Sequence, residues 1–323
     1  MFYGRIAAQS VVWAKMNALG RSPLGKPLDN ATASFYGQFV QAAYTMFRNP
    51  QGGDALRPEP AGIPAGYELG AWIHMSDFIL DVEDPKFYGI VVHRLDDVDS
   101  RIIGIRGTEG AIEWIDDAAA VPVPFRQVPS AGRVACGFDK IYNTLKVVKR
   151  NLPGAPARAA AAAPETFSGS FAQQLEQLAI SREVERGVAA PSDRVARPRR
   201  PTIVTGHSLG AALATLFVME NDARRKFDVS SLCTFASPRV GNMEFVRLFN
   251  QLPIDSWRIV NIRDVAPKLP PYIPGVLDYG HVDMAYPFNS SDFAKNNLLC
   301  WHSMETYLRW LDPSAKLLPE CIR

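Results

Sequence analysis

The sequence predicts an α/β domain built around a largely parallel sheet with helices on both faces. The first observation is that strand-like and helix-like segments alternate from about residue 70 onward, which is the pattern of strand–helix–strand units. The second is composition, because 47% of residues are hydrophobic and 21% are charged, as in a globular chain with a sizeable core. The third is length, since 323 residues suit one large α/β domain or two ordinary ones.

Individual elements follow from apolar and β-branched runs that end in turn residues. A pair of strands is expected around the polar turn DDVDS, at 87–95 and 101–107. Further strands are expected at 201–206, 231–237 and 256–263. Apolar residues at helical spacing predict helices at 139–150, 209–225 and 242–250.

We assign residues 1–323 to a single domain with two additions. Residues 1–70 form an N-terminal helical extension, whose first 20 residues fit an amphipathic helix. Residues 151–200 interrupt the alternation with links rich in Ala, Pro and Arg on either side of FAQQLEQLAISREVERG, which predicts one amphipathic helix. This insertion is either a mobile excursion without a catalytic role, or a cap over the site or a docking arm.

Charge and hydropathy narrow the classes of partner. With 35 basic and 33 acidic residues the formal charge is +2, so no nucleic-acid partner is expected. No apolar run approaches the ~18 residues of a membrane span, and the N-terminus lacks the continuous apolar core of a signal peptide. Location therefore stays open between the cytoplasm and export by a non-standard route.

The cysteines and histidines show no metal-ligand spacing, so we expect no metal and no cofactor. Buried free thiols are the default reading of the four cysteines. A disulfide between Cys300 and Cys321 stays open as the alternative for an exported protein.

The stretch VTGHSLGAALATL, at 204–216, places Ser208 between two glycines where a strand meets a helix. Such a turn holds its nucleophile in a strained conformation at the carboxyl edge of the sheet, and the glycines remove Cβ clashes. The N-terminus of the following helix favours developing negative charge. Ser208 is therefore the candidate nucleophile, and its weakly nucleophilic hydroxyl needs a base and a group that orients the base.

The partners of Ser208 are expected later in the chain, in the order acid and then histidine. Asp264 directly follows the strand expected at 256–263, which places its carboxylate at the same sheet edge as Ser208. His302 precedes an apolar-periodic C-terminal helix and is the preferred base, with His281 as the alternative. Three other aspartates follow strands less directly: Asp255, Asp278 and Asp283.

Several separate motifs stand in order from about residue 87 to 311, interrupted by the insertion: IRGTEG, EWIDD, CGFDKIYNTL, TGHSLGAALATL, FASPRVGN, NIRDVAPKLP, YGHV and WHSMETY. Together they resemble the class 3, fungal-lipase-like family of the α/β-hydrolase superfamily. This resemblance implies the α/β-hydrolase fold, with Ser208 as nucleophile, Asp264 as orienting acid and His302 as general base. In this family His281 matches a histidine that is not the base.

The resemblance also implies an oxyanion hole and a lid. Thr108 and the backbone N–H of Leu209 are the expected oxyanion donors. The lid is expected in TEGAIEWIDDAA, where an apolar face would cover the site when closed and meet lipid when open. The residues of that face are Ile112, Trp114 and Ile115.

These features predict a serine ester hydrolase that works through an acyl-enzyme. Triacylglycerol lipase activity is the first expectation, and phospholipase A1 or a soluble carboxyl or feruloyl esterase is the alternative. A non-catalytic binding scaffold is the remote alternative from another class. The expected partners are a lipid or other ester substrate and transient contact with a lipid interface, while the oligomeric state stays open.

Overall fold

The computed structural model of the chain describes residues 27, 29–48, 55–76, 85–97, 99–108, 120–151, 165–185 and 201–323. The strands within these ranges are β1 (Tyr67–Ser76), β2 (Pro85–Arg94), β3 (Arg101–Ile105), β4 (Pro122–Pro124), β5 (Arg133–Ala135), β6 (Lys146–Lys149), β7 (Pro201–His207), β8 (Asp228–Phe235), β9 (Gly241–Asn242), β10 (Asp255–Asn261), β11 (Tyr279–Gly280) and β12 (Met284–Phe288). The α-helices are α2 (Asn30–Arg48), α3 (Cys136–Tyr142), α5 (Phe171–Glu185), α6 (Leu209–Arg224), α7 (Met243–Phe249), α8 (Leu298–His302) and α9 (Met304–Leu311).

An eight-stranded sheet in the order β12-β10-β8-β7-β3-β2-β1-β6 forms the centre of the molecule. The strands from β12 to β3 run parallel to one another, whereas β2, β1 and β6 continue the sheet antiparallel. A small antiparallel sheet, β11-β9-β5-β4, lies beside it. The expected α/β-hydrolase fold is confirmed, with antiparallel strands added at one end of the parallel region.

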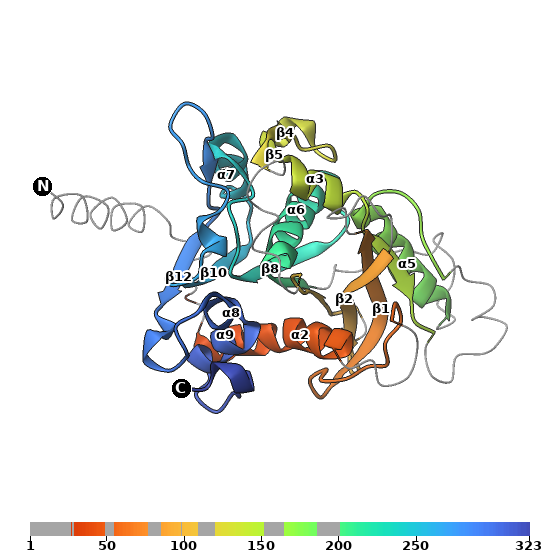
Figure 1. Ribbon diagram of the computed structural model, residues 1–323. Helices are drawn as coiled ribbons and strands as arrows, with labels where there is room; N and C mark the ends of the chain where they lie inside the picture. The colour runs from red at the N-terminus through yellow and green to blue at the C-terminus, as the bar shows by residue number, and fades with distance from the viewer. Residues whose placement is uncertain are drawn as a thin grey trace, which may run out of the picture.

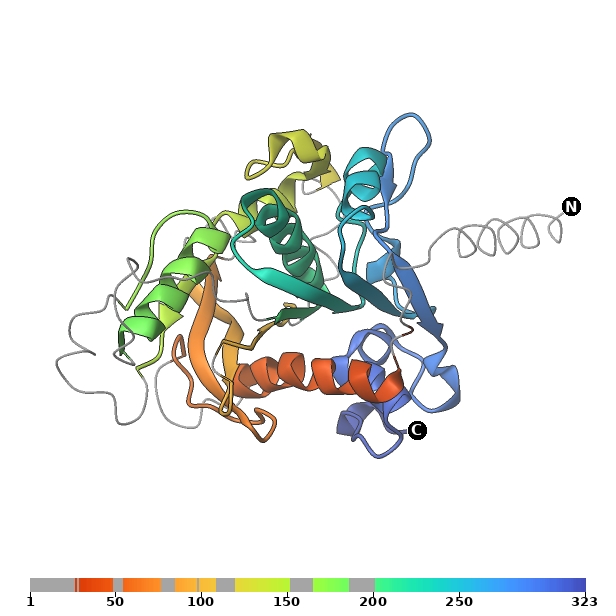
Figure 2. The same ribbon diagram turned by 180° about the vertical axis from the view of Figure 1, so that it is seen from behind.

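Helices cover both faces of the large sheet (Figures 1 and 2). On one face α6 packs over β7 and β8, with α3 and α5 against its outer side. Because α6 is enclosed from both directions, nearly all of its residues are buried, which explains why residues 209–219 are almost entirely apolar. On the opposite face α2 crosses β2, β3, β7 and β8 and packs along α9.

The contact between α2 and α9 is close because a glycine faces the partner helix. A Cβ at Gly37 would lie 2.8 Å from the Leu308 side chain and 2.9 Å from that of Met304. Polar contacts extend the interface, since Gln41 and Arg48 both donate to the Glu305 carboxylate. Residues 30–48 therefore form a structural layer of the domain, and Tyr67–Ser76 forms a strand inside its sheet.

The expectation of one helix across 139–150 is wrong. Helix α3 ends at Tyr142, and Lys146–Lys149 is strand β6. This strand pairs antiparallel with β1, from Ala71 opposite Lys149 to His74 opposite Lys146. Pairing with a strand from a much earlier part of the chain therefore overrides the local helical spacing.

Helix α5, from the segment assigned to the insertion, is joined to the sheet edge by buried charges. The Lys149 ammonium lies 2.5 Å from one Glu185 carboxylate oxygen, and the Arg182 guanidinium lies 2.9 Å from the other. These side chains are at most 3% exposed. Arg182 also donates to the carbonyls of Gly70 and Arg150, so the cluster links α5 to β1 and to the chain directly after β6.

Replacing Glu185 with alanine should destabilise the fold strongly, because two buried cations would lose their counter-charge. Breaking a buried pair in this way costs about 3–5 kcal/mol, which urea denaturation followed by circular dichroism would detect. The matched control is Glu176→Ala on the same helix, whose carboxylate is 36% exposed and contacts Lys226. That change should cost under about 1 kcal/mol. Equal losses in the two variants would contradict the assigned role of the buried cluster.

Candidate active site

The turn between β7 and α6 gives Ser208 an unusual backbone conformation. Its φ is +55°, a region that residues with a side chain rarely adopt. Its N–H donates to the carbonyl of Phe235 at 2.9 Å, which ties the turn to the end of β8. A Cβ at Gly210 would lie 2.3 Å from the Ile105 carbonyl oxygen, so glycine is required for α6 to approach β3 this closely.

The structure brings the three predicted triad residues together in one chain of hydrogen bonds. His302 Nε2 lies 2.8 Å from Ser208 Oγ, and His302 Nδ1 lies 2.7 Å from Asp264 Oδ2. Ser208 is 3% exposed and Asp264 is 1% exposed. In this arrangement the carboxylate faces one ring nitrogen, and the other ring nitrogen faces the hydroxyl, which is the geometry that activates a serine nucleophile.

Two further donors fix the Asp264 carboxylate. The Ala266 N–H donates to Oδ1 at 3.0 Å, and the Tyr307 hydroxyl donates to Oδ2 at 2.7 Å. Burial, followed by the neighbouring Asp264 charge, holds the pKa of Tyr307 well above its usual value, so the phenol keeps its proton. Tyr307 was not predicted as a site residue, because its place soon after His302 gives no local sign that it reaches an acid 43 residues earlier.

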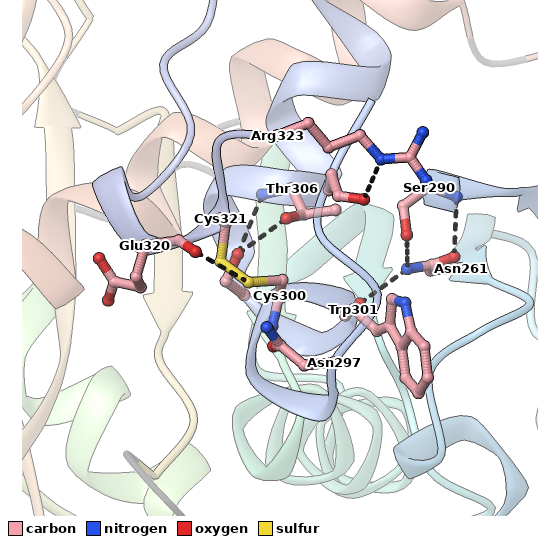
Figure 3. The surroundings of a disulfide bond; sticks show 11 residues. Asn261, Ser290, Asn297, Cys300, Trp301, Thr306, Glu320, Cys321 and Arg323 are labelled. Atoms are coloured by element: carbon pink, nitrogen blue, oxygen red, sulfur yellow. Dashed lines mark hydrogen bonds between the residues drawn. A yellow bond between two sulfur atoms is a disulfide. The ribbon is translucent and has the colours of Figure 1, made fainter. Parts of the chain in front are cut away.

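His302 ends the short helix α8, which is anchored at several points (Figure 3). A disulfide joins Cys300 to Cys321. The structure therefore has the disulfide that the sequence left open as the alternative to two free thiols. The Asn261 side-chain amide donates to the Trp301 carbonyl and to Ser290 Oγ, each at 2.8 Å. The peptide segment before His302 is therefore bound both to the C-terminal segment and to the end of β10.

The expected oxyanion donors come from two chain segments that meet at Ser208. Leu209 follows the nucleophile as the first residue of α6. Thr108 follows β3, whose Ile105 pairs with Gly206 of β7. Since a Cβ at Gly107 would lie 2.8 Å from Ser208 Cβ, the segment leading to Thr108 touches the nucleophile. The expected lid residues Ile112, Trp114 and Ile115 lie outside the described residues.

The other two histidines near the site make different contacts. His207 Nδ1 lies 2.8 Å from the Tyr44 hydroxyl, while His281 Nε2 lies 2.7 Å from the Pro267 carbonyl, so each ring is held away from Ser208 Oγ. Burial lowers the pKa of both well below its ordinary value, with His302 adding to the effect at His207 and Arg258 at His281. The structure thus places His302, and not the alternative His281, between Ser208 and Asp264.

Neither a metal cluster nor a membrane-spanning helix is found in the described parts of the chain. Across those residues, groups of three or more His, Cys, Asp or Glu side chains placed to share a metal ion are absent. Among the same residues, the helices are too short or too polar to cross a bilayer.

The geometry agrees with a match to a known family. A model of the family described as Lipase (class 3) matches residues 102–273, which is more than half of the chain. The chain therefore belongs to the class 3 lipase family. The matched range includes Ser208 and Asp264 but ends before His302.

Curated relatives extend this result. Phospholipase A1-II 1 of Oryza sativa subsp. indica is 29% identical over 218 residues, which cover 64% of this chain and 48% of the relative. Phospholipase A1 EG1 of the same plant is 27% identical over 92% of this chain and 72% of its own length. Several rice relatives are matched over only about half of their length, 48% to 49%.

Solved structures of fungal lipases share the fold. A propeptide complex of a Rhizomucor miehei lipase deletion mutant superposes with a TM-score of 0.53, at 22% identity over 80% of this chain and 67% of that chain. Lipase II from Rhizopus niveus superposes with a TM-score of 0.52, at 18% identity over 80% of each chain. At these levels of identity the likeness establishes the fold.

The perturbed histidines make the stability depend on pH. Below pH 6.5 the unfolded chain protonates His207 and His281, whereas the folded chain keeps both neutral because their pKa values are lowered. Burial raises the pKa of Asp283 to about 6, so below that pH the folded chain takes up one compensating proton. These three groups should therefore make the unfolding free energy fall by about 1.4 kcal/mol per pH unit between about pH 6 and 5.

Urea denaturation at pH 7, 6 and 5 measures this slope. A free energy of unfolding that stays constant or rises as the pH is lowered would contradict the neutral state assigned to the two buried histidines.

Proposed function

We propose that this chain is a serine ester hydrolase that cleaves acyl esters of glycerolipids, with Ser208, His302 and Asp264 as its catalytic triad. The observation that carries the proposal is the continuous hydrogen-bonded chain from Ser208 Oγ through the His302 ring to Asp264. Membership of the class 3 lipase family supports it independently.

The proposed chemistry follows from the positions of these groups. His302 Nε2 takes the Ser208 proton as Oγ attacks the ester carbonyl, and the imidazolium later returns the proton to the leaving alcohol. Asp264 holds the productive tautomer through Nδ1 and stabilises the charged ring. Water then hydrolyses the acyl-enzyme by the same route. Thr108 and the Leu209 N–H would stabilise the oxyanion, and losing one such donor typically costs ~100- to 1,000-fold in rate.

Triacylglycerol is the first proposed substrate, and a phospholipid cut at the first acyl position is the alternative. The second candidate is supported by the curated relatives, several of which are named phospholipase A1. The same triad suits both substrates because each reaction breaks a carboxylic ester. A soluble carboxyl or feruloyl ester is the third candidate.

Contact with a lipid surface is supported by exposed apolar residues on the segments next to Asp264 and His302. The turn at residues 271–276 follows Asp264 and its 3-10 helix η6 (Ala266–Lys268), and it has no charged residue. Three large side chains of this turn are exposed, by 41% to 72%: Tyr272, Ile273 and Val276. Leu298 and Leu299, just before His302, are also more than half exposed. We propose that these side chains contact the lipid phase while an ester enters the site.

Replacing Ser208 with alanine should lower turnover by at least about 10⁴-fold, because the nucleophile and its hydrogen bond to His302 are both lost. The matched control is Ser181→Ala on α5, which should keep wild-type activity. Release of fatty acid from emulsified triacylglycerol and from phosphatidylcholine vesicles measures both variants. Unchanged turnover in Ser208→Ala would overturn the proposed function and favour a binding scaffold.

The same assays rank the substrates. A phospholipase A1 releases the fatty acid of the first position and leaves a 2-acyl lysophospholipid. A triacylglycerol lipase is instead faster on the emulsion, with a rate that rises sharply once droplets form. Saturation below the solubility limit of the ester would favour a soluble esterase.

Placing a charge at the exposed turn tests the lipid contact. Val276→Glu should weaken binding to vesicles about tenfold or more, because an inserted valine gains about 1.5–3 kcal/mol from burial and a carboxylate does not. Hydrolysis of a short soluble ester should stay unchanged. Leu95→Glu is the matched control, since Leu95 is 60% exposed but follows β2, whose last residues lie beside the start of β3 and therefore at the opposite end of the strands from Ser208. Equal vesicle binding by both variants would refute the assigned contact surface.

A further inference from the structure

Gly107, the residue before the expected oxyanion donor Thr108, is packed against the nucleophile and against a tyrosine from the first helix described. A Cβ at this position would lie 2.8 Å from Ser208 Cβ, 2.8 Å from the Tyr44 hydroxyl and 3.0 Å from the His207 carbonyl oxygen. The segment after β3 therefore has little freedom to shift relative to the elbow.

Both polar groups of Gly107 are held by side chains. Its N–H donates to the Tyr44 hydroxyl at 2.9 Å. Its carbonyl accepts from Arg106 Nη1 at 2.7 Å. Because a trans peptide is planar, the Gly107 C=O and the Thr108 N–H point in opposite directions. Fixing this carbonyl therefore fixes the direction in which the Thr108 N–H points.

Arg106 is itself rigidly placed. Its Nε and Nη2 donate to the Phe87 carbonyl on β2, at 3.1 and 2.6 Å. The guanidinium lies between two aromatic rings, 3.6 Å from the Phe47 centroid and 4.2 Å from that of Tyr88. The residue is 1% exposed. A planar, permanently charged fork with five donors suits this task, which a flexible lysine ammonium cannot reproduce.

Tyr44 connects the same loop to the nucleophile elbow. Since its oxygen accepts from Gly107, its own proton is available to His207 Nδ1, 2.8 Å away. The phenol keeps that proton because burial raises its pKa, and His207 can accept it because burial lowers the imidazole pKa. One hydroxyl thus joins the oxyanion loop to the residue directly before Ser208.

We propose that Tyr44 and Arg106 are positioning residues that hold the Gly107–Thr108 peptide in the orientation that stabilises the oxyanion. The inference rests on the proposed function. Tyr44 lies on α2, outside the residues 102–273 that the family model matches, so the proposal makes a segment beyond the match part of the catalytic apparatus. Both residues act through the peptide and neither touches the ester.

The test is Tyr44→Phe in the full chain, with Tyr36→Phe on the same helix as the matched control. The phenylalanine keeps the packing and removes only the hydroxyl. On a soluble short-chain nitrophenyl ester, Tyr44→Phe should lower kcat about 10-fold or more and leave KM within about twofold, because the oxyanion exists only beyond the ground state. Affinity for an alkyl boronic acid, which forms a tetrahedral adduct with the serine, should fall by a similar factor.

The pH profile adds a readout that separates oxyanion positioning from disturbance of the base. The acid limb of kcat/KM should stay where it is in the wild type, because neither His302 Nδ1 nor the Asp264 carboxylate is bonded to Tyr44. Arg106→Lys should reproduce the loss of kcat and of boronate affinity if that variant folds. Should it not fold, Tyr44→Phe decides the question alone.

Three outcomes would overturn the inference. The first is a Tyr44→Phe variant whose kcat and boronate affinity equal those of Tyr36→Phe. The second is a Tyr44→Phe effect on KM alone. The third is a shifted acid limb of the pH profile, which would assign the effect to His302. Failure of the proposed function is recognised separately, because in that case Ser208→Ala would keep the activity of the wild type.

Discussion

The site depends on the close approach of two backbones, the end of β3 and the first turn of α6. The parallel register of β3 and β7, with Ile105 opposite Gly206, brings the two segments side by side. The absence of a side chain at Gly210 then lets them touch. On the proposed function, this close approach lets the Thr108 and Leu209 N–H groups serve one oxyanion, and a wider separation would move these two donors apart. The positive φ of Ser208 is the strained conformation that this packing maintains.

Asp264 and His302 are positioned differently. Each lies on a short segment that is fixed by hydrogen bonds or a disulfide to other parts of the chain. Asp264 accepts from Ala266 and Tyr307, and the peptide before His302 is bound by Asn261 and by the disulfide. Helix α9, which supplies Tyr307, packs in turn on α2. The triad is therefore rigid because of contacts between segments, although α8 itself is only five residues long.

Local sequence patterns predicted the parallel strands β3, β7, β8 and β10 but not β12. They also made Ser208, Asp264 and His302 the preferred site residues, with His281 left as the alternative base. Each of these residues follows a strand or precedes a helix with a strong apolar pattern, and each is marked by its own residue type. Contacts set by pairing across the chain could not be predicted in this way. The strand at Lys146–Lys149 exists because β1 pairs with it, and Tyr44 reaches Gly107 only because α2 crosses the sheet at that point. Neither position has a local signal that separates it from an ordinary apolar segment.

The position of His302 late in the chain also determines the stage of synthesis at which the active site can assemble. The ribosome delivers the nucleophile and the oxyanion loop well before it delivers the base, and Cys321 emerges later still. A nascent chain exposed only up to residue 280 contains the segments of β3, β7, β8 and β10, yet it lacks the His302 imidazole and the Tyr307 hydroxyl that contact Asp264. On the proposed function, the growing chain can hydrolyse no ester until His302 and Tyr307 have both left the exit tunnel, because Ser208 has no base and Asp264 lacks a supporting donor before then.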